Sequence, residues 1–595
     1  PRRSCATGRG ARVFRGEPGV GIVPSLMSHA RVLIHADVRT MDARRPRADA
    51  LAWRDGTLLA VGDRDAVLDA AGDAAEVLDA HGATVLPGFI DAHQHPTLTA
   101  LYGSRARLTP PRGTDITSLQ SAFLAAAKNV PPGRWVVATD WDELQLAERR
   151  PPTRAELDAA VPDHPLMAMH YTCHRALANS RALERAGIRR ATPDPAGGLI
   201  SRGRDGLPDG LLIERAMSPV ESLARADLIA HDADGFFDQL EAHHRALLAE
   251  GITRVVDATV PLDVIELYRE AERRGRVPVP TIMLPVSLGG YLEAPWDVFS
   301  APIAHGTNGP LTVGPVKLVF DGAPVCAMCL SVWQTAGAMV GALALSLRQG
   351  SLDPVRASLS VRPRVDVDGK VRTGLTLYPR AEAERVVRAA VDHGFMVAAH
   401  AIGNESIDVV LAAYKAAGPA LHQTRAPRIE HATFLDRDLA ARLAYAGVAV
   451  SAQPHMVTLP TVSGAPPVPG IRFMALRWLL DAGVKVAGSS DHPVTGFAPL
   501  DGIRSAVTRR TVGGRTYEPD QRVELDEALV MYTRAAADVC GCLTDCGTLE
   551  AGKRADLVVL DRTLSARTLD EVKVRATVLG GETLYGGVID ATRAT

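Results

Sequence analysis

Short apolar runs alternate with amphipathic segments through most of the 595-residue chain. We expect eight of these runs to be strands: VLPGFIDAHQH, GITRVVDA, PTIMLPVSL, VGPVKLVFDG, FMVAAHAIG, PRIEHA, VAVSAQPH and KVAGSSDHP. Segments with helical spacing, such as residues 380–394 and 405–418, lie between several of them. Repeated strand–helix units predict a parallel α/β sheet, and eight such units predict a closed (β/α)8 barrel of the TIM type.

The two ends of the chain carry a different pattern, in which apolar and polar residues alternate around turn signals. Residues 30–63 contain an Asp-Gly turn, and residues 552–587 contain a Gly-Gly turn, so both stretches predict β-hairpins. We therefore expect residues 28–86 and 545–592 to form one composite β-sandwich domain, with the barrel over residues 87–544.

Two stretches are too long to be simple connections within the barrel. The first, at about residues 105–235, has strand and helix patterns of its own and predicts a cap inserted over the barrel mouth. A second insertion is expected after the fourth strand, at about residues 323–375. It contains the apolar run AGAMVGALALSL (336–347), which is too short to span a membrane and predicts a buried helix.

Composition narrows the class of protein. The content of 46% hydrophobic and 23% charged residues fits a soluble protein with a sizeable core, and the net charge of −2 gives no reason to expect nucleic acid or a membrane as partner. Residues 1–27 are rich in Arg, Gly and Pro without the apolar core of a signal peptide, so we expect a disordered tail, with Met27 as a candidate natural start.

The seven cysteines are scattered and odd in number, which favours a reducing, cytoplasmic location over a disulfide framework. Cys326 and Cys329 form a CxxC pair, and Cys540, Cys542 and Cys546 form a second group. Neither has a matching pair at the spacing of a zinc site, so we expect packing thiols.

Five of the eight strands carry metal-binding residue types at or near their ends. These residues are His93, His95, Lys317, His400, His431 and Asp491. Residues two apart on a strand point to the same side, so His93 and His95 would direct two imidazoles at one point, an arrangement that suits a divalent metal. The alternative is a pair of surface histidines in a loop. Because barrel enzymes gather catalytic groups where strands end, the whole set favours a metal centre.

Lys317 is the unusual member of this set, because an ammonium group offers a metal no lone pair. A buried lysine loses its proton readily, and the neutral amine can add CO2 to become a carbamate that bridges two metals. The alternatives are an ion pair with Asp321 or a lysine that reaches solvent.

Longer motifs lie along the chain from about residue 30. They are LPGFIDAHQHP, RPPTRAELDAAVPDHPL, DPAGGLISRGRDGLPDGLLIE, GITRVVDA, VKLVFDG, AAHAIGN, RIEHA, SAQPHM, GSSDHPV and GTLEAGKRADLVVLD. In these motifs the chain resembles the amidohydrolase superfamily of metal-dependent hydrolases, and within it the amidohydrolase family 3 branch. That branch includes N-substituted formamide deformylases and YtcJ-like proteins.

The resemblance implies a role for each candidate residue. His93, His95 and Asp491 would hold the more buried metal, His400 and His431 would hold a second, and carbamylated Lys317 would bridge them. Zinc suits histidine and oxygen donors; manganese, iron and cobalt are alternatives, and some relatives use one metal. Catalysis would fall to Asp491, Lys317 and His431.

The expected reaction is hydrolysis of the carbonyl–nitrogen bond of a small molecule, such as an N-formyl or N-acyl amine. The metal lowers the pKa of water and polarises the carbonyl, while Asp491 moves the proton from the attacking water to the departing amine. Candidate substrate-binding residues, each with cap packing or a surface position as the alternative, are Trp141, Asp142, His170, His174, Trp333 and His455. We expect Glu214 to be structural.

The sequence departs from the branch at two places. Asn404 stands where relatives usually have aspartate, and residues 323–340 differ more widely, which puts the substrate in doubt. An esterase or lactonase would use the same metals. An aminohydrolase would have glutamate at the position of Gly403, and a non-catalytic scaffold would have lost ligands. The expected partner is a small molecule only, and a homodimer is one possible assembly.

Overall fold

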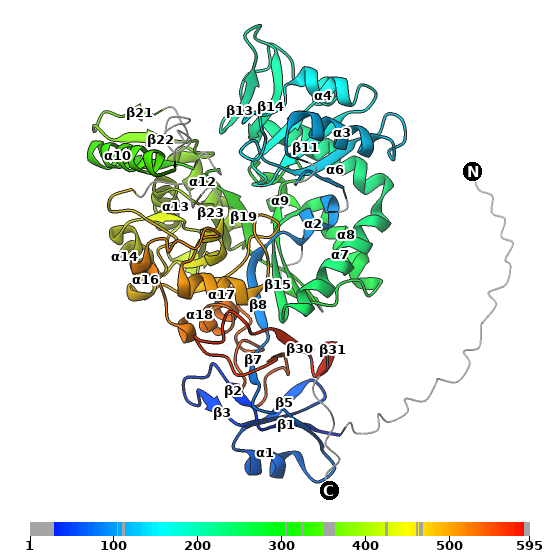
Figure 1. Ribbon diagram of the computed structural model, residues 1–595, viewed down its shortest axis with the longest axis vertical. Coiled ribbons are helices and arrows are strands. Elements are labelled where there is room, and N and C mark those ends of the chain that lie inside the picture. The colour runs from blue at the N-terminus through cyan, green and yellow to red at the C-terminus, as the bar shows by residue number, and fades with distance from the viewer. Residues whose placement is uncertain are drawn as a thin grey trace, which may run out of the picture.

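The computed structural model describes residues 29–587 except 104, 110–112, 304–305, 309, 323–325, 350–362, 423–425, 460–461 and 463–467 (Figure 1). The predicted tail at residues 1–27 therefore lies outside the described residues. Among the helices in the described ranges, none is long and apolar enough to cross a membrane.

All eight expected strands are present at the centre of the molecule. They are β8 (Phe89–Gln94), β15 (Ile252–Pro261), β16 (Thr281–Val286), β19 (Val316–Val319), β23 (Val397–Ala401), β24 (Arg428–His431), β26 (Ala449–Ala452) and β28 (Val486–Gly488). One sheet has the order β17-β18-β16-β15-β8, with β17 (Gly306–Asn308) and β18 (Leu311–Val313) at its edge, and the other has the order β19-β23-β24-β26-β28. Neighbours among the eight pair in parallel within each sheet. The parallel arrangement places their carboxyl ends at one edge.

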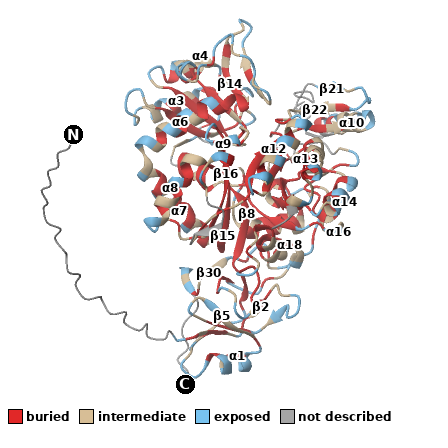
Figure 2. Cartoon of the chain, turned by 180° about the vertical axis from the view of Figure 1, so that it is seen from behind, coloured by how far each residue is buried: buried red, intermediate tan, exposed pale blue. Residues whose placement is uncertain are grey.

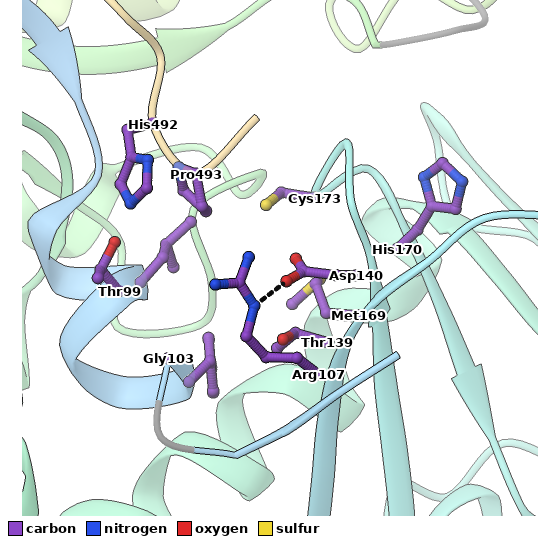
Figure 3. A pocket seen from close by; sticks show the side chains of 12 residues that line it. Thr99, Gly103, Arg107, Thr139, Asp140, Met169, His170, Cys173, His492 and Pro493 are labelled. Atoms are coloured by element: carbon purple, nitrogen blue, oxygen red, sulfur yellow. Dashed lines mark hydrogen bonds and ion pairs between the residues drawn. The ribbon is translucent and has the colours of Figure 1, made fainter. Parts of the chain in front are cut away.

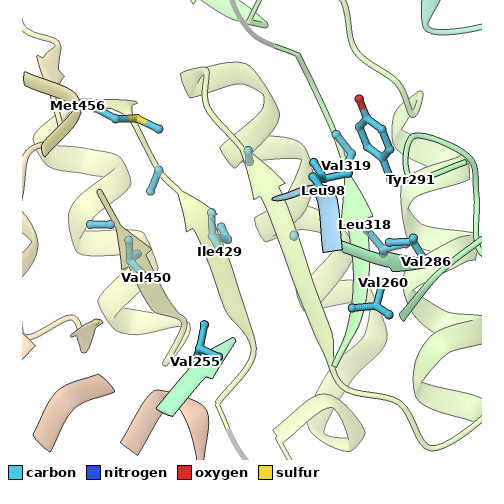
Figure 4. Packing of buried hydrophobic residues seen from close by; sticks show 14 of the residues in the cluster. Leu98, Val255, Val260, Val286, Tyr291, Leu318, Val319, Ile429, Val450 and Met456 are labelled. Carbon is cyan, nitrogen blue, oxygen red and sulfur yellow. The ribbon is translucent and has the colours of Figure 1, made fainter. Parts of the chain in front are cut away.

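Amphipathic helices flank these strands. They include α2 (Pro96–Tyr102), α7 (Ala233–Ala249), α8 (Leu262–Arg273), α12 (Arg380–Asp392), α13 (Asn404–Ala417), α14 (Arg437–Tyr445), α16 (Leu476–Asp481), α17 (Pro499–Thr508), α18 (Leu525–Met531) and α19 (Arg534–Cys540). Strand side chains such as Val255, Leu318, Ile429 and Val450 pack with helix side chains in one continuous apolar core (Figure 4). Figure 2 shows that the buried residues are concentrated along these strands. Close packing of these residues holds in place the backbone from which the polar side chains project.

Both chain ends meet in two further sheets. One has the order β5-β4-β1-β6, and the other has the order β3-β2-β7-β29-β30-β31. Their bounds are β1 (Arg31–Ile34), β2 (Asp37–Arg39), β3 (Arg47–Ala48), β4 (Ala50–Arg54), β5 (Thr57–Gly62), β6 (Glu76–Asp79), β7 (Thr84–Pro87), β29 (Leu557–Leu560), β30 (Val574–Leu579) and β31 (Glu582–Gly586). Asp55 and Gly56 both have positive φ between β4 and β5, as an Asp-Gly hairpin turn requires. Side chains of both sheets share one hydrophobic cluster, so strands from the two ends of the chain pack together.

The first insertion forms a six-stranded sheet of its own. Its order is β13-β14-β12-β11-β10-β9, from β9 (Ala106–Arg107), β10 (Val136–Trp141), β11 (Leu166–His170), β12 (Arg175–Ala178), β13 (Gly198–Arg202) and β14 (Pro208–Glu214). Helices α3 (Ile116–Ala127), α4 (Arg154–Ala160) and α5 (Ser180–Arg185) accompany it, and α6 (Ser218–His231) leads back to α7. We call residues 106–214 the inserted sheet. In Figure 1 it lies at the end of the molecule opposite β1–β5.

The second insertion contains the expected helix, but not with the expected burial. Helix α10 (Val332–Gln349) follows β20 (Met328–Leu330). Strand β22 (Val371–Thr373) pairs with β20 on one side and with β21 (Arg364–Val365) on the other. The prediction of a buried helix at 336–347 is wrong, because Val340, Leu343 and Leu347 are exposed. An apolar run predicts a helix from local propensity, whereas burial needs a neighbouring element.

Candidate metal centre

All six candidate metal-binding residues line one pocket, although they lie on or just after five strands spread over about 400 residues of sequence. The pocket is lined by His93, His95, Leu98, Thr172, Cys173, His174, Thr259, Tyr291, Lys317, Val319, His400, His431, Asp491 and Val494. The sequence placed these residues at or near strand ends. Lys317 instead lies within β19, and Asp491 lies three residues beyond β28.

Asp491 connects the loop after the last strand to the histidines at the end of the first strand. Its Oδ1 lies 3.3 Å from His93 Nε2 and 3.0 Å from His95 Nε2. The Asp491 amide N–H also donates to the His93 carbonyl at 2.8 Å. The two imidazoles therefore converge on one carboxylate oxygen, as the spacing in the sequence predicts.

His431 groups with this carboxylate more closely than the expected division between two metals suggests. One nitrogen or oxygen atom from each of His93, His431 and Asp491 lies within 4.8 Å of the others, and all three residues are buried. The His400 ring is next to them, 4.4 Å from the His431 ring between centroids. The six residues thus form one compact set, in which His431 adjoins both expected groups.

Two buried side chains that the sequence analysis missed hold the histidines in place. His93 Nδ1 hydrogen-bonds to Glu430 Oε2, and His431 Nδ1 lies 2.8 Å from Gln453 Oε1. Each bond fixes a ring so that its Nε2 faces the pocket, as outer partners of metal-bound histidines do. The motif RIEHA could have pointed to Glu430, because this acid directly precedes His431 at the end of a buried strand.

Asp91 joins β8 to the loop that carries Asp491. Its carboxylate accepts hydrogen bonds from the His93 amide at 3.2 Å, the Ser490 amide at 3.1 Å and the Ser490 hydroxyl at 2.6 Å. Gln94 Nε2 donates to the same carboxylate at 3.1 Å. The backbones on both sides of the candidate site are therefore tied to one buried acid.

The electrostatics of the pocket favour neutral nitrogens and an ionised Asp491. Burial lowers the pKa of His95 to about 4, of His431 to about 3 and of Lys317 to about 8. Burial by itself raises the pKa of Asp491, but the neighbouring His93 and His95 side chains hold it well below its usual value. Neutral imidazoles and a carboxylate are electron-pair donors near neutral pH, and the Lys317 amine becomes one as its proton is lost near pH 8.

Several of these donor atoms have no hydrogen-bond partner within the part of the chain that the structure describes. They are the buried atoms His93 Nε2, His95 Nδ1, His400 Nε2 and Lys317 Nζ. A buried polar atom without a partner is costly, so its position calls for an explanation. All four residues line the same pocket as Asp491, and nitrogen and carboxylate donors are the ligands that zinc prefers. The residues therefore fit a metal.

The candidate substrate residues lie in different places. His174 lines the pocket itself. Trp141 is fully buried in the inserted sheet and donates from Nε1 to the Ala168 carbonyl, and Trp333 on α10 is 86% exposed. His455 is half-buried in the short 3-10 turn Pro454–Thr458, with Nδ1 3.3 Å from the Gly496 carbonyl. Of these four, His174 alone is brought to the candidate metal residues.

His170 and Asp142 belong to a second group that could hold an ion. His170, Asp142 and Glu143 have potential ligand atoms within 4.8 Å of one another. Arg175, however, forms two hydrogen bonds to Glu143, at 2.6 and 3.0 Å, and lies 2.7 Å from His170 Nε2. A guanidinium already neutralises this group, so we interpret it as an ion pair that packs the inserted sheet.

A second pocket adjoins the first and shares Leu98 and Cys173 with it (Figure 3). It lies between α2, the strands β10 and β11 and the loop at Pro493, and it is also lined by His170. Arg107 and Asp140 form an ion pair of 2.7 Å across it. The remaining lining is largely apolar, so the two pockets together offer a polar end and an apolar end.

Comparison with known proteins assigns the class. Residues 76–585 match the model of the amidohydrolase family, and the chain belongs to that family. The match identifies it as a hydrolase.

Among its relatives, the N-substituted formamide deformylase of Arthrobacter pascens is 32% identical over 564 residues, covering 93% of this chain and 98% of the relative. The YtcJ protein of Bacillus subtilis is 28% identical over 528 residues, covering 85% of this chain and 89% of the relative. A metal-dependent hydrolase from Pyrococcus furiosus has a similar fold, with a TM-score of 0.63, 23% identity and coverage of 90% and 99%.

Proposed function

We propose that the protein is a metal-dependent enzyme that hydrolyses the carbonyl–nitrogen bond of a small amide. The observation that carries the proposal is the single pocket in which four histidines, Lys317 and Asp491 present donor atoms, several of them without partners among the described residues. Membership of the amidohydrolase family supports the same reaction class.

We infer that the eight parallel strands close into a (β/α)8 barrel. Strand β16 contacts β19, and β28 contacts β8, at the two places where the parallel sheets adjoin. The candidate site then lies at the carboxyl ends of the strands, where such barrels carry their chemistry. The terminal sheets would form a β-sandwich, and the inserted sheet would act as the cap.

His93, His95, His400, His431 and Asp491 would hold the metal, with zinc as the first choice. A carbamate on Lys317 would add an oxygen ligand, and the lowered pKa of this amine supports its reaction with CO2. A metal held there would lower the pKa of water and polarise the substrate carbonyl.

Asp491 is the residue that we assign to proton transfer. Its hydrogen bond with His95 and the neighbouring His93 ring keep it ionised and fixed in direction, so it can accept a proton from the attacking water. The same carboxyl then passes the proton to the departing amine, which leaves as a neutral molecule.

The substrate class that fits best is an N-formyl or other small N-acyl amine. The name of the Arthrobacter relative supports it, since that protein is an N-substituted formamide deformylase. The polar pocket would take the amide group, and the adjoining, largely apolar pocket at Leu98 and Cys173 would take the substituent on nitrogen.

The test is a panel of matched amides and esters incubated with zinc-loaded protein, in which released amine or alcohol is measured. We expect amine release from short N-acyl amines, and no release in the presence of a chelator. Preferential cleavage of the esters would instead favour an esterase or lactonase. No release from any member of the panel would overturn the proposal.

A further inference from the structure

His174 and Glu214 form a buried pair that links the inserted sheet to the candidate site. His174 Nδ1 lies 2.8 Å from Glu214 Oε2. The two residues are also joined through the backbone, because the Glu214 amide donates to the His174 carbonyl at 3.0 Å. Side chain and backbone together fix the imidazole relative to the carboxylate.

Glu214 is held at some cost to stability. It is fully buried at the end of β14, and its φ of 51° is in the left-handed region that side chains other than glycine rarely adopt. Its second oxygen, Oε1, has no hydrogen-bond partner among the described residues. Strained backbone and an unpartnered buried oxygen both destabilise the fold, and such strain concentrates at functional sites.

The carboxylate of Glu214 reaches out of the inserted sheet and lies against Gly322, three residues beyond β19. A Cβ atom at position 322 would be 1.6 Å from Glu214 Oε1, so only glycine leaves room for it. Glu214 therefore packs against the segment that directly follows β19, the strand that carries Lys317.

The other end of the His174 ring is in the pocket of the candidate metal residues. His174 lines that pocket, and its ring centroid is 5.2 Å from that of His400. Since Nδ1 is engaged by Glu214, the free end of the imidazole is Nε2. This atom makes no hydrogen bond to the described part of the chain, and His174 remains slightly accessible from the pocket.

We propose that Glu214 positions His174 as a hydrogen-bond donor to the carbonyl oxygen of the amide substrate. The carboxylate accepts the Nδ1–H and stabilises positive charge on the ring, so Nε2 can present its own N–H to the pocket. Negative charge grows on the carbonyl oxygen as water adds, and a fixed donor there acts most strongly in the transition state. His174 is then a catalytic residue, and Glu214 is a positioning residue. This inference rests on the proposed function.

A double-mutant cycle tests the pair. The variants are His174→Ala, Glu214→Ala, the double variant and Glu214→Gln, whose amide oxygen can still accept the Nδ1–H bond. His164→Ala is the matched control, because this histidine of the inserted sheet bonds the Arg134 carbonyl and does not line the pocket. Kinetics on the best amide and the metal content are measured for each.

We expect His174→Ala to lower kcat by about 10²–10³-fold with little change in KM or metal content. The double variant should be no slower than His174→Ala, because Glu214 acts through His174. Glu214→Gln should lie between the wild type and His174→Ala, and this variant also covers the case in which Glu214→Ala does not fold.

Full kcat in His174→Ala, or losses that multiply in the double variant, would overturn the inference while leaving the proposed function intact. A wild-type protein that binds metal and hydrolyses no amide would overturn the proposed function instead, and the inference with it.

Discussion

Asp491 Oδ1 lies 3.0 Å from His95 Nε2, although 396 residues separate the two along the chain. The contact joins the end of the first parallel strand to the loop after the last. It places the Asp491 carboxylate, the proposed proton acceptor, beside the imidazoles of His93 and His95. The proposed mechanism depends on this arrangement.

Replacement of Asp491 by asparagine tests its role in proton transfer. Asn retains the size of the side chain but cannot take a proton, so kcat should fall by about 10²–10⁴-fold. Amine release under saturating substrate measures the effect, with metal content determined on the same sample. Retention of more than a tenth of wild-type kcat by metal-loaded Asp491→Asn would show that another group moves the proton.

Glu430→Gln tests the support given to His93. Loss of the carboxylate weakens the bond to His93 Nδ1, and loss of such an outer partner lowers metal affinity by about 10–100-fold. Competition with a chelator measures this affinity. Glu266→Gln, at an exposed position on α8, is the control and should bind metal as the wild type does.

Lys317 should take up CO2 when its amine is unprotonated. Because burial lowers its pKa to about 8, the reactive amine is far more abundant at pH 8 than at pH 6. With 13C-labelled bicarbonate, we expect a carbamate carbon signal in the NMR spectrum that is stronger at pH 8. The signal should vanish in Lys317→Ala and persist in Lys415→Ala, whose lysine is exposed. An identical spectrum for all three proteins would exclude the carbamate.

The raised pKa of Asp257, which is not one of the candidate metal residues, predicts that the stability of the fold depends on pH. Burial raises its pKa from 3.8 to about 6, against the opposing effect of hydrogen bonds from Tyr268 and Thr97. A carboxyl with a raised folded-state pKa stabilises the fold while it is protonated. This contribution, on the order of 3 kcal/mol, is present below pH 4 and is lost as pH rises through 6.

The comparison for Asp257 is with Asp257→Asn, which has no carboxyl to titrate. The stability of the wild type relative to this variant should fall between pH 4 and pH 7, as measured by thermal unfolding across that range. A constant difference between the two proteins would mean that Asp257 does not titrate there.

The sequence predicted the eight strands because each is an apolar run bounded by clear turn or helix signals. It also predicted that His93 and His95 would converge, since that follows from the alternation of side chains along one strand. The roles of Glu430 and Gln453 were missed because each depends on which strands lie side by side, and sequence spacing does not encode that.

The insertions were the least predictable parts. Glu214 was expected to be structural, and only its place against Gly322 and His174 suggests more. Trp333 and the apolar residues of α10 looked suited to a pocket or a core, yet they are exposed, because their burial depends on neighbours that local sequence does not specify.

The central claim is that the six pocket residues bind metal, and elemental mass spectrometry of the purified protein tests it most directly. The account predicts about two metal ions per chain in the wild type and fewer in Lys317→Ala. A protein that holds no metal after zinc and bicarbonate have been supplied would contradict it.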